Sequence, residues 1–188
     1  MDESTKQLIG ETRKQIPMKS GQNAKYDYEY IRKGVCNIFM VNEALVGSRH
    51  VQITKRKTKK DWARLMETIS DDYYPKAKRI TVVLDNYGTH KAGAFYETFN
   101  PNRAKRLLDR FELVYTPKHG SWLNVAEIEL NVLFGQCLNR RIDNIETVIK
   151  EVRAWQIDRN EKKNNIDWQF TIDDARIKLK RLYPNLIY

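Results

Sequence analysis

The fold of this chain is decided by one stretch, Thr81-Val82-Val83-Leu84-Asp85-Asn86, which continues as Tyr87-Gly88-Thr89-His90. Its β-branched and apolar run predicts a strand that is buried on both faces and ends in an acid. In open α/β sheets, ligands bind beyond the carboxyl ends of the strands, which makes Asp85 the first candidate for chemistry. The competing interpretation is a strand-end acid that only caps the following turn.

Length and composition bound the possibilities. The 188 residues suffice for one domain with a full core, and they contain no internal repeat. A net charge of +10 favours an anionic partner, either nucleic acid or an acidic membrane surface. No apolar run reaches membrane-spanning length and no signal peptide opens the chain, so we expect a cytoplasmic protein. Cys36 and Cys137 lie far apart, which disfavours a disulfide framework or a zinc ribbon.

The first third of the chain predicts strands. Residues 2–25 look like a polar connection that can contribute little to a core. Alternation over residues 26–30 and the apolar run over residues 35–41 predict a hairpin, and residues 51–53 predict a third short strand.

The remaining pattern alternates helices and strands. Helix starts are expected at Thr58, at Asn100 with Pro101, after Asn124, at Asp143 and at Thr171, and a strand is expected over residues 111–115. The last helix is expected to bury Ala175, Leu179 and Leu182 and to pack on the same domain. This order of elements fits a mixed α/β sheet flanked by helices.

Asp85 needs partners, and the helix after Asn124 offers Glu127 and Glu129. Both glutamates lie roughly 80° from the centre of the apolar face of that helix, on opposite flanks, so geometry does not choose between them. Both also lie in the first turn, where the helix dipole favours any anion, and they are open to a purely structural interpretation.

Two motifs carry a family resemblance. Leu84-Asp85-Asn86 with His90, followed by Pro117-Lys118-His119-Gly120-Ser121-Trp122-Leu123-Asn124-Val125-Ala126-Glu127, resembles the catalytic core of Tc/mariner-type transposases, and most of all their bacterial insertion-sequence branch. The resemblance extends to Trp168-Gln169-Phe170 near the end of the chain. It implies an α/β, ribonuclease-H-like mixed sheet flanked by helices, with residues 1–188 forming a single catalytic domain.

That family uses an Asp, Asp, Glu triad, and the resemblance selects Glu127 as the third acid. The first acid then maps onto Asp2, which is followed by Glu3. Only Met1 precedes Asp2, so the first strand is expected to be truncated. The upstream helix-turn-helix region of such transposases is expected to be absent from this chain. The resemblance also implies a homodimer on paired DNA ends.

Three carboxylates suit two Mg²⁺ or Mn²⁺ ions, which neutralise charge on the attacking and leaving oxygens of a phosphodiester. Asp2, Asp85 and Glu127 are therefore predicted as metal ligands and catalytic residues of a DNA-cleaving and strand-joining enzyme. Asn86, His90 and Asn124 are predicted to support them. For His90, a turn histidine bonded to nearby backbone is an equal alternative. A noncatalytic nucleic-acid-binding domain and a structure-specific nuclease remain as other functions.

A basic surface is predicted to contact DNA phosphates, with a solvated charge run as the ordinary alternative. Its predicted members are Arg49, Lys55, Arg56, Lys57, Lys59, Lys60, Lys118, His119, Arg140 and Arg141, with Arg153 and Arg159 as extensions. Trp122 is predicted to stack on an unpaired base, although a core position competes.

Overall fold

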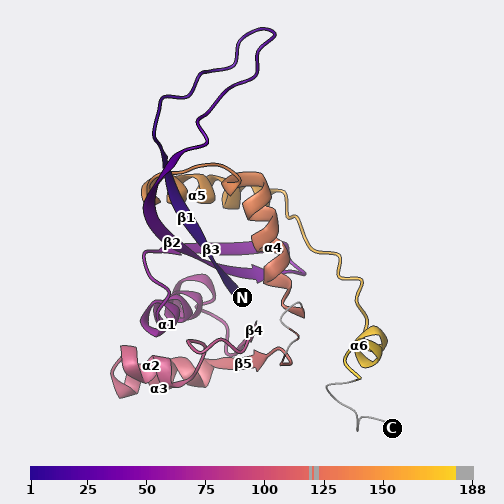
Figure 1. The fold of residues 1–188 in the computed structure, drawn as a ribbon. Coiled ribbons are helices and arrows are strands. Elements are labelled where there is room, and N and C mark those ends of the chain that lie inside the picture. The colour runs from indigo at the N-terminus through magenta and orange to yellow at the C-terminus, as the bar shows by residue number, and fades with distance from the viewer. Residues whose placement is uncertain (119, 121–122, 181–188) are drawn as a thin grey trace.

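The computed structural model describes residues 1–118, 120 and 123–180. It confirms the mixed α/β architecture, with antiparallel and parallel strands flanked by helices (Figure 1). The strands are β1 (Asp2–Glu11), β2 (Tyr30–Glu43), β3 (Ser48–Thr54), β4 (Ile80–Leu84) and β5 (Phe111–Tyr115). The helices are α1 (Lys59–Thr68), α2 (Gly93–Thr98), α3 (Pro101–Arg110), α4 (Val125–Leu133), α5 (Ile145–Glu161) and α6 (Ile172–Lys178), with π-helical turns η1 (Ile69–Tyr73) and η3 (Phe134–Leu138).

The first sheet is antiparallel, in the order β1-β2-β3. β1 pairs with β2 from Asp2↔Met40 to Glu11↔Tyr30, so the expected polar connection over residues 2–25 is wrong in its first half. The strand escapes pattern recognition because only Leu8 and Gly10 among its residues are buried. Backbone hydrogen bonds to β2, whose paired residues lie up to 38 positions away, hold β1 in the sheet. The strand therefore needs no apolar stripe of its own.

Residues 12–29 form an arm between β1 and β2 that extends away from the rest of the molecule (Figure 1). Isolated bridges join Ile16 to Lys25 and Lys19 to Gln22. Tyr26 and Tyr28, which were expected to begin a strand, lie in this arm and are 69% and 85% exposed. Their alternation with acids therefore reflects a solvated segment.

The second sheet consists of the parallel pair β4 and β5, in register from Ile80↔Phe111 to Leu84↔Tyr115. Both strands were expected. The burial of β4 on both faces was not correct, because Val82 and Leu84 are buried whereas Thr81 is exposed and Val83 is 44% exposed. The single mixed sheet expected from the sequence is thus two sheets side by side.

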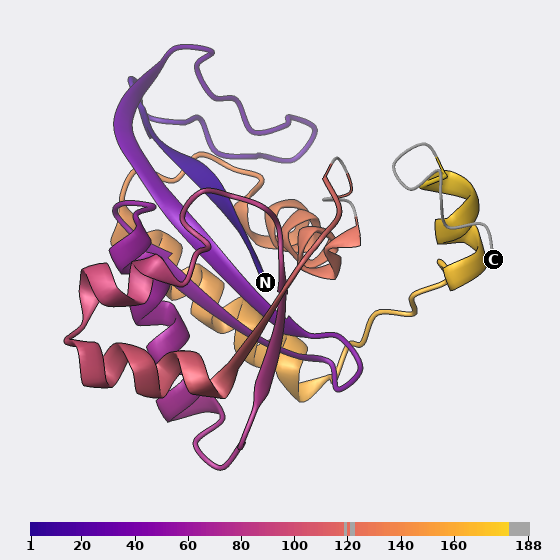
Figure 2. The ribbon, with the colours of Figure 1, turned by 90° about the horizontal axis from the view of Figure 1, so that it is seen from below.

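Two apolar clusters hold the layers together. On one face of β2, Phe39 packs with Trp62 of α1, Val82 of β4 and Leu107 of α3. On the other face, Ile38 and Met40 pack with side chains of α4 and α5. Figure 2 shows α1, α2 and α3 gathered on the opposite side of the strands from α4. Successive side chains of β2 point to opposite faces of the sheet and therefore pack into two different apolar clusters.

Local sequence determines most helix starts. Thr58 forms a capping box with Asp61, and Asn100 accepts a hydrogen bond from the Arg103 amide, as expected. The start of α5 was assigned one residue early, because the N-cap is Asn144, which accepts from the Thr147 amide.

The last helix differs from expectation. Thr171 does start α6 with a capping box, but the helix has no buried residue. It lies to the side of the domain at the end of an extended segment (Figure 1). The predicted packing of Ala175 and Leu179 is therefore wrong, and Leu182 lies outside the described residues. Among the residues that the structure describes, no helix is both long and apolar enough to cross a membrane.

We expect acid to weaken the tie between η1 and α3. Arg106 donates two hydrogen bonds to Asp71, at 2.9 and 2.7 Å, which lowers the pKa of that carboxyl to about 2. A depressed pKa stabilises the fold above the unfolded value near 4, and this contribution is lost as the pH falls toward 2. Urea unfolding of the wild type should therefore lose more free energy between pH 4.5 and 2.5 than unfolding of Asp71→Asn.

The matched control for this measurement is Asp109→Asn, because Asp109 forms only an exposed pair with Lys105. Its pH dependence should follow the wild type. Equal slopes for the wild type and Asp71→Asn would show that Asp71 contributes nothing.

Candidate active site

Three segments that are far apart in sequence meet at Met1. The Met1 amine donates a 2.6 Å hydrogen bond to the carbonyl of Val83 on β4. The Asn124 side chain, which caps α4, donates a 2.7 Å hydrogen bond to the Met1 carbonyl. The start of β1, the end of β4 and the N-terminus of α4 are therefore joined at one residue.

This junction brings the predicted acids to the same end of the sheets. Burial raises the pKa of the Asp2 carboxyl, and the negative charge of Asp85 raises it further, so the two carboxylates interact. Glu127 lies in the first turn of α4 with an exposed side chain. Within the described part of the chain, no three His, Cys, Asp or Glu side chains are grouped closely enough to hold a metal ion. The Asp2 and Asp85 carboxylates thus interact electrostatically, whereas Glu127 belongs to no such group.

His90 bridges two acids from a fully buried position. Its Nε2 lies 2.8 Å from Glu3 Oε2, and its Nδ1 lies 2.9 Å from Asp85 Oδ1. Burial lowers the pKa of the imidazole, but the hydrogen bond to Glu3 and the charges of Glu3 and Asp85 outweigh burial, so the net pKa is raised. A protonated ring can donate from both nitrogens at once, and it thereby orients Asp85.

The sequence analysis did not predict a role for Glu3. Its partner His90 is 87 positions away, and no local spacing links them. His90 was left open between a role at the site and an ordinary turn contact. The structure shows the turn contact, with Nδ1 3.4 Å from the Asp85 carbonyl, and also a contact with the Asp85 carboxylate at 2.9 Å.

Asn86 fixes the loop that carries Asp85. Its side chain donates a 2.6 Å hydrogen bond to the carbonyl of Thr116, just beyond the end of β5. The Tyr87 amide donates to Asp85 Oδ1 at 3.1 Å, and no described residue bonds to Oδ2 of that carboxylate. Among the described residues, Asp85 thus has protein donors on Oδ1 and none on Oδ2.

The two glutamates of α4 have different environments. Glu129 is 1% exposed and forms ion pairs with Arg49 at 3.1 Å and Arg159 at 2.9 Å. Arg49 is also fully buried, so its predicted contact with DNA is wrong, and Arg159 is largely buried in the same cluster. Buried charged groups are almost always paired with an opposite charge, which explains why Glu129, Arg49 and Arg159 can all be buried together. Glu129 therefore has a structural role in this ion-pair cluster, whereas the side chain of Glu127 is exposed to solvent.

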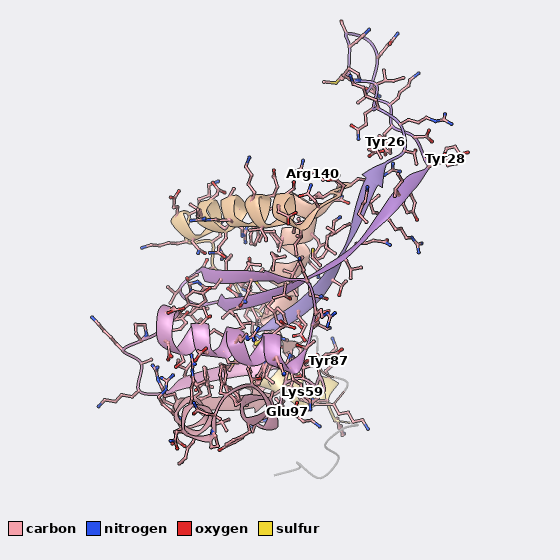
Figure 3. All side chains as sticks on the ribbon, turned by 90° about the vertical axis from the view of Figure 1, so that its left-hand side faces the viewer. Tyr26, Tyr28, Lys59, Tyr87, Glu97 and Arg140 are labelled. Carbon is pink, nitrogen blue, oxygen red and sulfur yellow. The ribbon has the colours of Figure 1, made fainter. Side chains whose placement is uncertain are left out.

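The basic segment between β3 and α1 lies beside the acids. Lys57 Nζ is 3.9 Å from Glu3 Oε1 and 4.2 Å from the centre of the Tyr87 ring. Lys59, at the start of α1, is paired with Glu97 of α2; both side chains are labelled in Figure 3. Within the described residues, five exposed basic side chains of the predicted DNA surface and its extensions have no ion-pair partner: Lys55, Arg56, Lys60, Lys118 and, on α5, Arg153.

Arg140 and Arg141 lie elsewhere. Arg140 pairs with Glu151, and Arg141 pairs with Glu11 and lies 5.4 Å from the Tyr26 ring. Figure 3 places Arg140 near the base of the arm, at the end of the molecule away from Lys59. These arginines therefore do not continue the basic segment beside the acids. The predicted contacts of His119 and Trp122 lie outside the described residues.

The donor set fits a hard divalent cation. Asp2 and Asp85 present carboxylate oxygens, which Mg²⁺ and Mn²⁺ prefer, and their mutual repulsion would be relieved by a cation between them. Asp2 forms no ion pair with any described side chain, whereas Asp85 contacts His90. Glu127, in the first turn of α4, lies outside this pair of carboxylates.

Comparison with protein families gives one finding. A family described as DDE superfamily endonuclease matches residues 1–149, which include Asp2, Asp85 and Glu127. Comparisons with curated proteins and with solved structures gave no match.

The two glutamates of α4 should differ in their effect on stability. Glu129→Gln leaves the buried Arg49 and Arg159 without their counter-charge, and breaking a buried ion pair costs about 3–5 kcal/mol. Glu127→Gln removes an exposed charge and should change the free energy of unfolding by less than about 0.5 kcal/mol. Urea denaturation followed by circular dichroism compares the two variants. Equal losses would contradict the assigned environments.

Proposed function

The chain belongs to the DDE superfamily of endonucleases, and from that premise we propose that it is the catalytic domain of a DNA transposase. We assign it to the bacterial insertion-sequence branch of the Tc/mariner superfamily, on the motifs around Asp85 and Glu127. The observation that supports the proposal is the junction at Met1, where hydrogen bonds join the start of β1 to the end of β4 and to the cap of α4. Residues 1–188 then form one catalytic domain.

The proposed reaction is nicking of DNA at the element ends followed by strand transfer. Asp2, Asp85 and Glu127 are the proposed ligands of two Mg²⁺ or Mn²⁺ ions. These carboxylates would hold the ions, and the ions would supply positive charge for activating water or a 3′-hydroxyl and for neutralising the leaving oxygen. His90 holds Asp85 through Nδ1, and Asn86 anchors the loop behind it. Both act as positioning residues, because neither side chain is required to contact DNA.

The proposed DNA path runs over the segment between β3 and α1. Lys55, Arg56 and Lys60 are exposed there, and Lys57 links the segment to the acids through Glu3 and Tyr87. Phosphates bound by these cations would therefore lie next to Asp85. We further propose that the protein acts as a homodimer on paired element ends, in the bacterial cytosol.

A structure-specific nuclease is the second candidate function. The same acids would cut DNA without joining strands, and the family description names only an endonuclease. The reaction products separate the two candidates, because strand transfer leaves the labelled element end covalently attached to target DNA. A noncatalytic DNA-binding domain of the same fold would give neither product.

Nicking should depend on a divalent cation and on the acids. With labelled terminal-repeat DNA and Mn²⁺, Asp85→Asn and Glu127→Gln should each nick about 1,000-fold more slowly than wild type, since ligand loss removes several kcal/mol of charge stabilisation. Glu146→Gln, which changes an exposed first-turn glutamate of α5, is the matched control and should nick normally. In calorimetric titrations, the wild type and Glu146→Gln should bind Mn²⁺ more tightly than Asp85→Asn and Glu127→Gln do. Wild-type nicking by Asp85→Asn would overturn the site.

DNA affinity should weaken steeply with salt. Each phosphate contact contributes a slope of about 0.9 in a plot of log affinity against log salt, so replacing Lys55, Arg56 and Lys60 by Ala should flatten that slope by about 2–3. Lys105→Ala on α3 should leave the slope unchanged, because Lys105 is paired with Asp109. Fluorescence anisotropy between 50 and 250 mM salt measures both. A flat response of the wild type would contradict phosphate binding.

A further inference from the structure

Glu3 is a buried acid outside the predicted triad. Its side chain, on β1, is 3% exposed. A buried carboxylate is costly unless opposite charges or hydrogen-bond donors surround it. Within the described residues, its charged side-chain contacts are His90 Nε2 at 2.8 Å and, beyond hydrogen-bond distance, the Lys57 ammonium at 3.9 Å. The Oε1 atom has no hydrogen-bond partner in the same part of the chain. Stability alone is therefore a weak reason for a carboxylate at this position.

Glu3 and its neighbour Asp2 point to opposite faces of β1, because successive side chains of a strand alternate. Asp2 is paired with Met40 and Glu3 with Phe39, and these two partners pack into different apolar clusters. Directly opposite residues share a face, so Glu3 lies on the side of Phe39 and Trp62. It is therefore not placed to hold a cation together with Asp2.

The side chain of Glu3 reaches the candidate site through the fully buried ring of His90. Nε2 of the ring contacts Glu3, and Nδ1 lies 2.9 Å from Asp85 Oδ1. The rings of Trp62 and Tyr87 pack against the imidazole, with centroids at 5.6 and 5.9 Å. Such packing does not distinguish one ring nitrogen from the other. The bond to Glu3 therefore determines which nitrogen faces Asp85.

Glu3 is linked to both carboxylates that interact at the site. Its backbone amide donates a 2.8 Å hydrogen bond to Asp2 Oδ1, while its side chain holds His90 against Asp85. Among the described residues, the donors to the Asp85 carboxylate act on Oδ1. One residue of β1 thus bears on the orientation of two acids that the chain brings together from distant segments.

We propose that Glu3 is a positioning residue of the candidate active site, which holds the His90 ring so that Nδ1 orients the Asp85 carboxylate for a divalent cation. This inference rests on the proposed function and adds a residue to it. Glu3 itself contacts neither the cation nor DNA. Loss of a group that orients a metal ligand through a histidine typically lowers metal affinity or activity by about 10–100-fold.

A purely structural ion pair and a direct metal ligand are the competing interpretations, and side-chain chemistry separates them. A glutamine in place of Glu3 can accept a hydrogen bond from the ring or donate one to it, so it can hold His90 in either protonation state. A methionine has a similar length but donates nothing and accepts only weakly. A positioning role therefore predicts that Glu3→Gln retains what Glu3→Met loses. A direct ligand would be lost in both variants.

The test measures Mn²⁺ affinity of the whole chain by calorimetry, together with nicking of labelled DNA. Glu3→Met should bind Mn²⁺ about 10–100-fold more weakly than the wild type, whereas Glu3→Gln should stay within about threefold. Glu11→Gln is the matched control, because Glu11 is an ion-paired glutamate at the other end of β1, and it should bind normally. Wild-type affinity in Glu3→Met, or equal losses in the two Glu3 variants, would overturn the proposal.

A second set of variants tests whether Glu3 acts through His90. His90→Phe keeps an aromatic ring but removes both nitrogens, so Glu3 has nothing left to position. The double variant Glu3→Met/His90→Phe should therefore bind Mn²⁺ as weakly as His90→Phe alone. Still weaker binding by the double variant would show that Glu3 acts by another route and would overturn the proposal.

A measurement on the wild type does not depend on the folding of any variant. Addition of Mg²⁺ should shift the nuclear magnetic resonance signals of both His90 ring nitrogens, because Nδ1 contacts Asp85 and Nε2 contacts Glu3. The ring of His50, which stacks on Tyr73, should not shift. Unchanged His90 signals in a chain that binds Mg²⁺ would overturn the role of Glu3. Failure of the proposed function is distinguishable, because the wild type itself would then neither bind Mn²⁺ nor nick DNA.

Discussion

The candidate site depends on two hydrogen bonds made by the backbone of Met1. One joins the start of β1 to Val83 of β4, and the other joins it to Asn124, which also caps α4. Because each acid follows its anchoring residue closely, these bonds place Asp2, Asp85 and Glu127 at one end of the fold. A buried ammonium group is a costly anchor, and burial lowers the pKa of the Met1 amine to about 6. The bond to Val83 offsets part of that cost.

A second tie fixes the rotation of α4 about its axis. Glu129 is held from β3 by Arg49 and from α5 by Arg159, so the helix cannot turn without breaking two buried ion pairs. Glu127 lies two positions earlier, about 200° around the helix, and is therefore directed away from that cluster. The charged cluster thus decides which glutamate of the pair faces the solvent side of the junction.

Sequence alone predicted the elements whose signals are local. Strands β4 and β5, the capping box at Thr58 and the cap at Asn100 all depend on neighbours within a few residues. The sequence-based prediction was wrong where contacts join distant segments. Strand β1 is held by pairing with β2, and Arg49 is buried in an ion pair with Glu129, which is 80 positions away. No periodicity encodes such pairs, and an arginine in a basic run looks exposed. The family resemblance selected Glu127, which spacing alone could not do.

The acids at the candidate site differ in how many basic side chains contact them, and this difference affects how readily each one ionises. Glu3 and Asp85 share the buried His90, whose pKa is raised by its hydrogen bond to Glu3 and by the charges of the two acids, and Lys57 adds positive charge beside Glu3. Asp2 has no such partner among the described side chains, and burial beside Asp85 raises its pKa. A carboxyl that is costly to ionise is stabilised in its charged form by a nearby cation, so a divalent ion bound beside Asp2 would lower the pKa of that carboxyl.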